Sequence, residues 1–256
     1  MSIRKPLDPA MVRSKIALKR IMTPVGAVLL LLTSSLALCQ EDLGPPTAIV
    51  AGLRSENKET QTRVAKLLDL NFAPTRDFRN CDIRHDPAML DEQGRTFVLQ
   101  IKCKNDINVV VLRDHGGLSE VLSSRGFRAA SDHWSVAFTS LIGPSVQEIM
   151  IHNVALSPGT DHKSYFLVLR LAGRNLEVVF SALEAVAVHQ PSGTGYRQES
   201  KFTTVPASEA RPGEIGELAI VQSDGRTFAI RRSFGWSEGL QAFVELEAPT
   251  VHPADN

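Results

Sequence analysis

The chain has 256 residues and a formal net charge of zero, with 43% hydrophobic, 6% aromatic and 22% charged residues. Residues 1–40 hold six of the 28 basic residues and one of the 28 acidic residues, so the rest carries 22 basic and 27 acidic side chains, a formal charge of −5. A phosphate backbone is bound by clustered Lys and Arg, and no basic run follows residue 40, which argues against nucleic acid as a partner.

Residues 25–38 are an apolar run that decides which part of the chain is exported. No charged residue lies between Arg20 and Glu41, and six basic residues precede the run against one acid, Asp8. A basic segment, an apolar segment and small residues, in this order, are typical of a secretory signal. We therefore predict that residues 1–39 are a signal peptide, with Met11 as an alternative start. The rest is predicted to be periplasmic or extracellular.

Three fates of this leader are open. Cleavage by a signal peptidase needs small residues at the last and third-last positions before the cut, and Ser35 with Ala37, or Ala37 with Cys39, meets this need. Lipidation of Cys39 would need a small residue before it, where Leu38 stands. An uncleaved anchor would use residues 21–40, the only part of the sequence that is predicted to contact a membrane. A transmembrane helix takes about 20 apolar residues, and this segment reaches that length only if its polar Thr and Ser residues are counted.

The three cysteines become two when the leader is removed with Cys39. Cys81 and Cys103 remain, an even number in an oxidising compartment, so we predict that they form a disulfide. A metal site or a catalytic thiol is the alternative, but no Cys-x-x-Cys spacing supports it.

A helical hairpin is predicted after a short linker that ends in Gly-Pro-Pro. Within residues 47–70, Ser55 is suited to cap a second helix that places Val64, Leu67 and Leu68 on one face. This segment resembles a single helical hairpin of the HEAT-repeat type, and the resemblance covers about 24 residues. Repeat arrays need about three units and no second copy follows. Residues 40–78 are therefore predicted to be a linker and a hairpin that docks on the domain or on a partner.

The pattern becomes that of β-strands from Arg79 onward. Residues 96–103 alternate between apolar and polar side chains, as a half-buried strand does, and residues 107–112 follow as a more apolar strand of the same hairpin. Residues 115–128 are predicted to form one inserted helix, which Gly126 would end.

Short strands joined by tight turns are predicted for the rest of the domain, residues 79–248. Neighbouring strands of this kind form an antiparallel meander. The predicted fold class is mainly β: an antiparallel β-sandwich or open barrel of about eight to ten strands, preceded by the helical hairpin. Residues 249–256 are predicted to be a flexible tail. The predicted strands are residues 134–142, 146–154, 163–171, 175–180, 182–189 (a strand or short helix), 201–205, 217–221 and 226–232.

Motifs for common enzyme chemistry are missing from the sequence. It has no Gly-x-Ser-x-Gly elbow and no P-loop, and Gln198 stands where a dinucleotide fingerprint that begins at Gly193 would need a glycine. We predict no cofactor.

Asp and His neighbours are the remaining candidates for a site. Imidazole and carboxylate ligands suit zinc or non-haem iron, but the pairs would have to meet in space, and solvated turns are the alternative interpretation. The candidate metal ligands are Asp82, His85, Asp86, Asp132, His133, Asp161 and His162.

Isolated polar and aromatic residues within the strands are given structural interpretations. His152 and His189 are interpreted as histidines satisfied at strand ends rather than catalytic bases. Glu148 and Glu177 are interpreted as solvent-facing positions of half-exposed strands. Trp134 and Trp236 are interpreted as core or rim residues.

Three hypotheses of function follow. The first is an exported, non-catalytic module that binds a protein or a small molecule through loops or a sheet edge. The second is a metal-assisted hydrolase built on the Asp and His pairs. The third is a structural or assembly protein that its leader tethers to a membrane.

Overall fold

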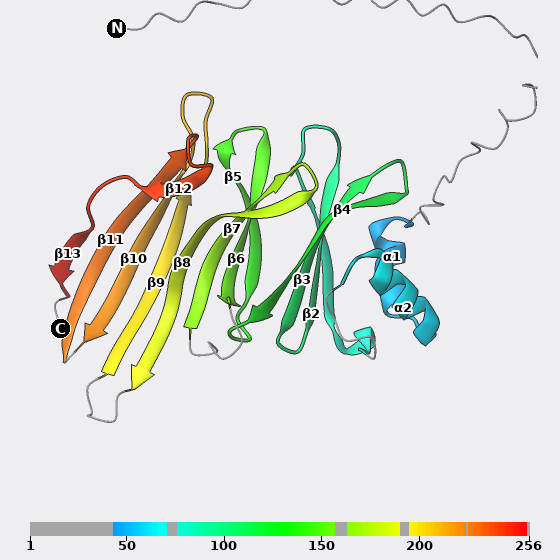
Figure 1. The fold of residues 1–256 in the computed structure, drawn as a ribbon, viewed down its shortest axis with the longest axis horizontal. Helices are drawn as coiled ribbons and strands as arrows, with labels where there is room; N and C mark the ends of the chain where they lie inside the picture. Colours follow the sequence, from blue (N-terminus) through cyan, green and yellow to red (C-terminus); the bar gives the residue numbers. More distant parts are fainter. Residues whose placement is uncertain (1–42, 71–75, 157–162, 190–194, 224, 255–256) are drawn as a thin grey trace, which may run out of the picture. The chain divides into compact units, whose positions relative to one another are not determined.

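A computed structural model describes residues 43–70, 76–156, 163–189, 195–223 and 225–254, which belong to one compact unit (Figure 1). The helices are α1 (Pro46–Leu53), α2 (Lys58–Leu67) and the 3-10 helix η1 (Phe78–Asn80). The strands are β1 (Asp82–Ala88), β2 (Thr96–Cys103), β3 (Asp106–Asp114), β4 (Ser119–Ala129), β5 (Ser135–Gly143), β6 (Val146–Ala155), β7 (Lys163–Ala172), β8 (Asn175–His189), β9 (Gly195–Val205), β10 (Glu214–Ser223), β11 (Arg226–Ser237), β12 (Ala242–Glu245) and β13 (Thr250–Pro253).

All the strands belong to one antiparallel sheet, mostly in chain order. The path runs β1-β2-β3-β4-β6-β7-β8-β9-β10-β11-β12, while β5 pairs with β6 and β13 pairs with β11. The long strands β8 to β11 lie side by side (Figure 1). The two ends of this path do not pair with each other in the described part of the chain, so the sheet is open. The predicted mainly antiparallel β fold behind a helical hairpin is confirmed.

The helical hairpin starts and turns with ordinary capping chemistry. Pro46 occupies the start of α1, where its fixed φ suits a helix and its missing N–H costs nothing. Asn57 caps α2, because its side chain accepts hydrogen bonds from the N–H groups of Glu59 at 2.8 Å and Thr60 at 3.3 Å. Ser55, the predicted cap, instead accepts a hydrogen bond from the Asn57 N–H. No helix in the described part of the chain has the length and apolar character needed to cross a membrane.

Three hydrophobic cores lie on the faces of the curled sheet. The first gathers residues of β2 to β4 and β6 to β8, such as Val109, Ile151 and Leu167, which are fully buried. The second lies on the other face of β1 to β3, where the helical hairpin packs, and includes Leu53 and Leu99. The third is aromatic. It includes Phe166, Phe180 and Phe243, with Phe202, Phe234 and Trp236 packed against it.

The prediction of a helix at residues 115–128 is wrong, because strand β4 occupies most of this range. Gly116 and Gly117 adopt positive φ in the turn before this strand. Val111 pairs with Ser123 while Leu112 pairs with Val121, so Leu122 is an extra residue in a β-bulge. The bulge breaks the alternation of period two, and it gave the apolar residues of this strand the spacing of a helix face.

Bulges and edge pairing also explain the other differences from prediction. The segments predicted at 175–180 and 182–189 form one strand, β8, with Val179 and Glu184 as extra residues of two bulges. Within the tail that was expected to be flexible, β13 pairs with β11 and remains exposed on all four residues. The described part of the chain has 13 strands, more than the eight to ten predicted, because β4 and the edge strands β1, β12 and β13 were not predicted.

Candidate functional site

The candidate site is a pocket of about 610 Å³, named here the end pocket, formed where several strands of the sheet end. The β1–β2 connection, β3, β4, the β5–β6 turn and the β7–β8 turn all contribute to its wall. Its apolar lining consists of Leu90, Leu122, Ile142, Val146 and Leu171, and its charged lining of Asp91, Glu92, Arg113, Glu148, Arg170 and Arg174.

Glu148 on β6 is the buried acid of the end pocket. It is only 1% exposed, so its interpretation as a solvent-facing residue is wrong. The register of β5 on β6 shifts between Thr139 and Gly143, and the N–H groups of Leu141 and Ile142 donate to Glu148 Oε2 at 2.6 and 3.3 Å. Burial raises the pKa of Glu148, against the opposing effect of these two hydrogen bonds and of the Arg170 charge.

Arg170 on β7 faces this acid. Ile149 pairs with Leu169, so the next position of the same register places Glu148 opposite Arg170. The Arg170 guanidinium donates to the side-chain oxygen of Gln241 at 2.8 Å and lies 5.7 Å from the centre of the Trp236 ring. Among the described residues no carboxylate lies within ion-pair distance of Arg170, and its two contacts are with neutral groups.

The two other arginines of the end pocket are paired with acids. Arg113 donates to Asp91, and Glu120 contacts Arg174 at 2.8 Å, His115 at 3.0 Å and Arg113 at 3.6 Å. The hydrogen bond from His115 is the largest cause that lowers the pKa of Glu120, and the two arginines add to it. Burial alone would raise the pKa of Asp91, but the Gln93 N–H and Arg113 bring it below its ordinary value. The charges of Arg113 and Arg174 are therefore already neutralised.

The residues predicted as metal ligands do not form a metal site in the described part of the chain. Within those ranges, no group of three or more His, Cys, Asp or Glu side chains is placed to hold a metal ion. Asp161 and His162 lie outside the described residues.

Most of the described candidates have other contacts. On β1, Asp82 contacts Arg84 at 2.7 Å, Asp86 accepts from Gln100 at 2.8 Å, and the His85 ring lies edge-on to the Phe97 ring with centres 6.4 Å apart. Between β4 and β5, Asp132 contacts Lys102 at 3.4 Å, and the backbone N–H of the exposed His133 donates to Ser131.

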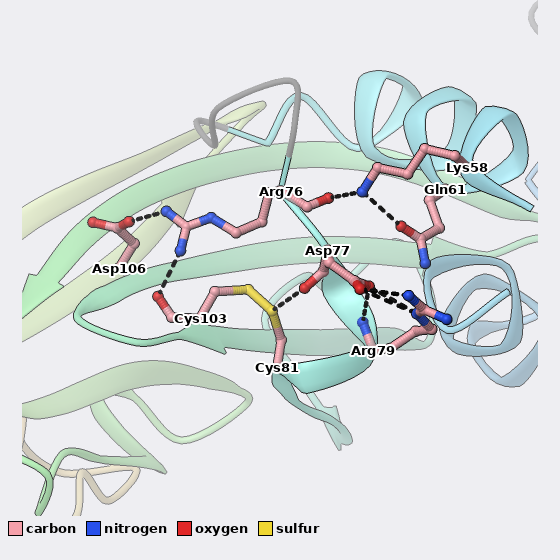
Figure 2. Close-up of a disulfide and its surroundings, with 8 residues drawn as sticks. All are labelled: Lys58, Gln61, Arg76, Asp77, Arg79, Cys81, Cys103 and Asp106. Atoms are coloured by element: carbon pink, nitrogen blue, oxygen red, sulfur yellow. Dashed lines mark hydrogen bonds and ion pairs between the residues drawn. A yellow bond between two sulfur atoms is a disulfide. The ribbon is translucent and has the colours of Figure 1, made fainter. Parts of the chain in front are cut away.

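The predicted disulfide between Cys81 and Cys103 is confirmed (Figure 2). Asp82 pairs with Lys102, so the two cysteines occupy the next opposed position, just outside β1 and at the end of β2. Both are buried in the core under the helical hairpin. The crosslink therefore ties the entry to β1 onto β2.

Polar side chains surround this disulfide on the connection from α2 (Figure 2). Arg76 forms an ion pair with Asp106 at 2.5 Å and donates to the Cys103 carbonyl at 3.2 Å, while Lys58 of α2 donates to the Arg76 carbonyl at 2.5 Å. Hydrogen bonds from Arg79 hold the pKa of Asp77 well below its ordinary value. Arg76 and Arg79 are paired with Asp106 and Asp77, and Lys58 donates to a backbone carbonyl, so these contacts form a structural link between α2 and the β1–β2 hairpin.

The other single residues have structural positions. His152 Nδ1 lies 2.7 Å from a carboxylate oxygen of Glu184, whose second oxygen accepts from the N–H of Asn153, so the interpretation of a satisfied histidine is confirmed. Trp134 packs against the first core and Trp236 against the third. Glu177 is exposed, as predicted, and the side chain of His189 is outside the described part.

Comparison with protein-family models, with curated proteins and with solved structures gave no match for this chain. The end pocket therefore has to be interpreted from its own residues. Sequence reasoning missed Arg113, Glu120, Arg170 and Arg174 as site residues. The only signal for Glu148 was a carboxylate within an otherwise apolar strand, and that signal does not distinguish a buried position from an exposed one.

Proposed function

We propose that the domain is exported and binds a small molecule in the end pocket without catalysing a reaction on it. The observation that carries the proposal is the combination, in one pocket, of an apolar lining, a buried carboxyl group at Glu148 and an arginine, Arg170, that has no carboxylate within ion-pair distance among the described residues. Ligand pockets of about 300–1,000 Å³ with a few convergent polar groups and a perturbed pKa are the usual binding sites of folded domains.

A binding role fits the lining better than a catalytic one. Neither His nor Cys occurs among the described lining residues, so no imidazole or thiol is present to act as a base or nucleophile. The hydroxyl of Ser145 donates to the carboxylate of the exposed Glu92 at 3.2 Å, and no imidazole lies beside it among the described lining residues. Export is supported by the leader at residues 1–39 and by the disulfide, which forms in oxidising compartments.

Ligand-observed NMR on residues 41–256 tests the binding role. A panel of small amphipathic molecules is screened against the wild type, against Ser145→Trp, which fills the pocket mouth, and against the matched control Ser233→Trp on the exposed surface of β11. We expect ligands whose binding is lost in Ser145→Trp and kept in Ser233→Trp. Hits that bind both variants equally, or a panel without hits, would contradict the proposal.

Export is tested separately, by cell fractionation and by sequencing the N-terminus of the recovered protein. We expect a mature chain that begins near Leu38 or Gln40 in an exported fraction. A cytoplasmic chain that begins at Met1 or Met11 would contradict export.

A further inference from the structure

The charges of the end pocket do not all cancel within the protein. Asp91 neutralises Arg113, and Glu120 lies between Arg113 and Arg174. Glu92 at the rim accepts a hydrogen bond from the neutral Ser145. The charge of Glu92 is not cancelled by this neutral partner, but Glu92 is exposed to solvent. Away from the rim, the charged groups that are left are Arg170 and the buried carboxyl group of Glu148, on neighbouring strands.

Arg170 and Glu148 together have two charge states, and these states attract an anionic ligand to different extents. With Glu148 ionised, its negative charge balances Arg170, and the pocket offers an anion little attraction. With Glu148 protonated, Arg170 is unbalanced and the pocket carries one more positive charge. Two negative charges near one arginine in a buried site repel strongly, because the effective dielectric constant there is about 20 or less.

Protonation of Glu148 leaves its local hydrogen bonds intact. The N–H groups of Leu141 and Ile142 both donate to the same oxygen, Oε2, which continues to accept them as the carbonyl oxygen of a neutral carboxyl group. Burial already favours this neutral form. The change therefore needs no rearrangement of β5 or β6.

We propose that the end pocket binds molecules with one negative charge on an apolar body, and that each binding event is coupled to uptake of one proton by Glu148. The anionic group contacts Arg170, and the apolar part covers the lining that includes Leu122, Val146 and Leu171. The proton comes from the buffer, so the complex gains one anion and one proton with no net change of charge. This inference rests on the proposed function, because it names the ligand class of that same pocket.

The groups that face Glu148 from the neighbouring strands are consistent with the uptake of a single proton by Glu148. From β5 come the two N–H donors and Thr139, and from β7 comes Arg170. Among the described lining residues the other charged groups are Asp91, Glu92, Arg113 and Arg174; Asp91 is paired with Arg113, and the exposed Glu92 contacts Ser145. Depressed pKa values keep Asp91 and Glu120 ionised around neutral pH, so they contribute no proton uptake there.

Isothermal titration calorimetry with three probes of equal chain length tests the inference. The probes are 1-decanesulfonate, which stays anionic, neutral 1-decanol and the cation decyltrimethylammonium, with the two ions below their micellar concentrations and decanol below its solubility limit. Each titration is repeated in two buffers of different ionisation enthalpy and at several values from about pH 5 to about pH 9, which gives the number of protons taken up. We expect decanesulfonate alone to take up protons, approaching about one per molecule bound where free Glu148 is ionised.

Single substitutions distinguish the contribution of Glu148 from that of Arg170. Glu148→Gln keeps an acceptor for both N–H groups, and it should bind decanesulfonate with no proton uptake and with an affinity independent of pH. The wild type should lose up to about tenfold in affinity per pH unit above the range in which Glu148 is protonated. Arg170→Gln should weaken decanesulfonate by about 10–100-fold and change decanol by less than about twofold. The matched controls Glu177→Gln and Arg197→Gln, both at exposed positions, should behave as the wild type.

The outcomes distinguish this inference from the function on which it rests. Decanol or decanesulfonate binding that Ser145→Trp abolishes, with no proton uptake in the wild type, would overturn the inference and leave the binding function standing. Proton uptake that persists in Glu148→Gln, or a preference for the cation, would also overturn the inference. If none of the three probes binds, the inference fails, and the NMR panel decides separately whether the binding function stands. Thermal unfolding without ligand verifies that each variant is folded before it is titrated.

Discussion

Removal of the disulfide should destabilise the domain by a calculable amount. Cys81 and Cys103 are 22 positions apart, and closing a loop of this length removes about 3 kcal/mol of chain entropy from the unfolded state. We therefore expect Cys81→Ala/Cys103→Ala to lower the free energy of unfolding by at least about 3 kcal/mol. For a domain of this size that corresponds to a fall in Tm of about 6–12 °C.

The assay is urea unfolding of residues 41–256, with oxidised wild type, reduced wild type and the double variant measured together. The reduced wild type keeps both sulfur atoms in the core and isolates the crosslink, whereas the variant also loses the packing of two buried side chains. We expect the order oxidised, then reduced, then variant. An unchanged denaturation midpoint after reduction, or two free thiols in the native protein, would refute the reasoning.

The position of the crosslink predicts where protection is lost. Lys58 donates to the Arg76 carbonyl, Arg76 donates to the Cys103 carbonyl, and the disulfide joins Cys81 to Cys103, so these links together hold residues 76–81 against the β1–β2 hairpin (Figure 2). Hydrogen exchange followed by mass spectrometry should show faster exchange in α1, α2 and β1 after reduction, with β9 to β11 unchanged. Uniform acceleration across the domain would contradict this local effect.

Three further substitutions have predicted effects on stability. Glu148→Gln should match the wild type in stability below about pH 4 and become more stable than the wild type as pH rises, because only the wild type then has to release a proton from a buried acid. The difference in the free energy of unfolding should reach about 1.4 kcal/mol for each unit by which the folded pKa of Glu148 exceeds the unfolded pKa. Urea unfolding across pH measures this difference, and a difference that does not change with pH would contradict the prediction. Gly213→Ala should lower the free energy of unfolding by about 1–3 kcal/mol, because the added Cβ would lie 2.4 Å from the Val205 carbonyl oxygen. Gly239→Ala, with open space around the added Cβ, should change the free energy of unfolding by no more than about 0.5 kcal/mol, and equal effects of the two substitutions would refute the argument. Asn57→Ala should cost about 1 kcal/mol through loss of the α2 cap and Ser55→Ala clearly less, and the reverse order would show that Ser55 is the cap.

The regular part of the fold was predictable because its strands are apolar runs bounded by turn residues. β2 matches the predicted range 96–103, and the predicted strands at β3, β5, β6 and β7 differ from the structure by one or two residues at their ends. β2 and β3 are buried on both faces, by the first core on one side and the second on the other, so a run of apolar residues marks them more clearly than alternation does. Turn residues such as Gly225, with positive φ before β11, marked the ends of strands correctly.

The end pocket could not be predicted, because five separate parts of the chain form it. Arg113, Glu120 and Arg174 are ordinary charged residues near strand ends, and only the strand order brings them together. The Asp and His residues were predicted as metal ligands because they are neighbours in the sequence. Adjacent residues of a strand point to opposite faces, so adjacency is a weak guide to a shared site in a β protein.

Irregular positions of the sheet determine the chemistry of the pocket as well as its shape. In a regular β5–β6 ladder, the N–H groups of Leu141 and Ile142 would follow the strand pairing and Glu148 would have no backbone donor. The register shift between Thr139 and Gly143 instead turns both groups toward this carboxyl group. A buried acid is tolerated there because these donors serve its charged and its neutral form alike. The property that would couple anion binding to a proton thus arises from a local departure from the period-two pattern, which is the pattern that sequence analysis of a strand relies on.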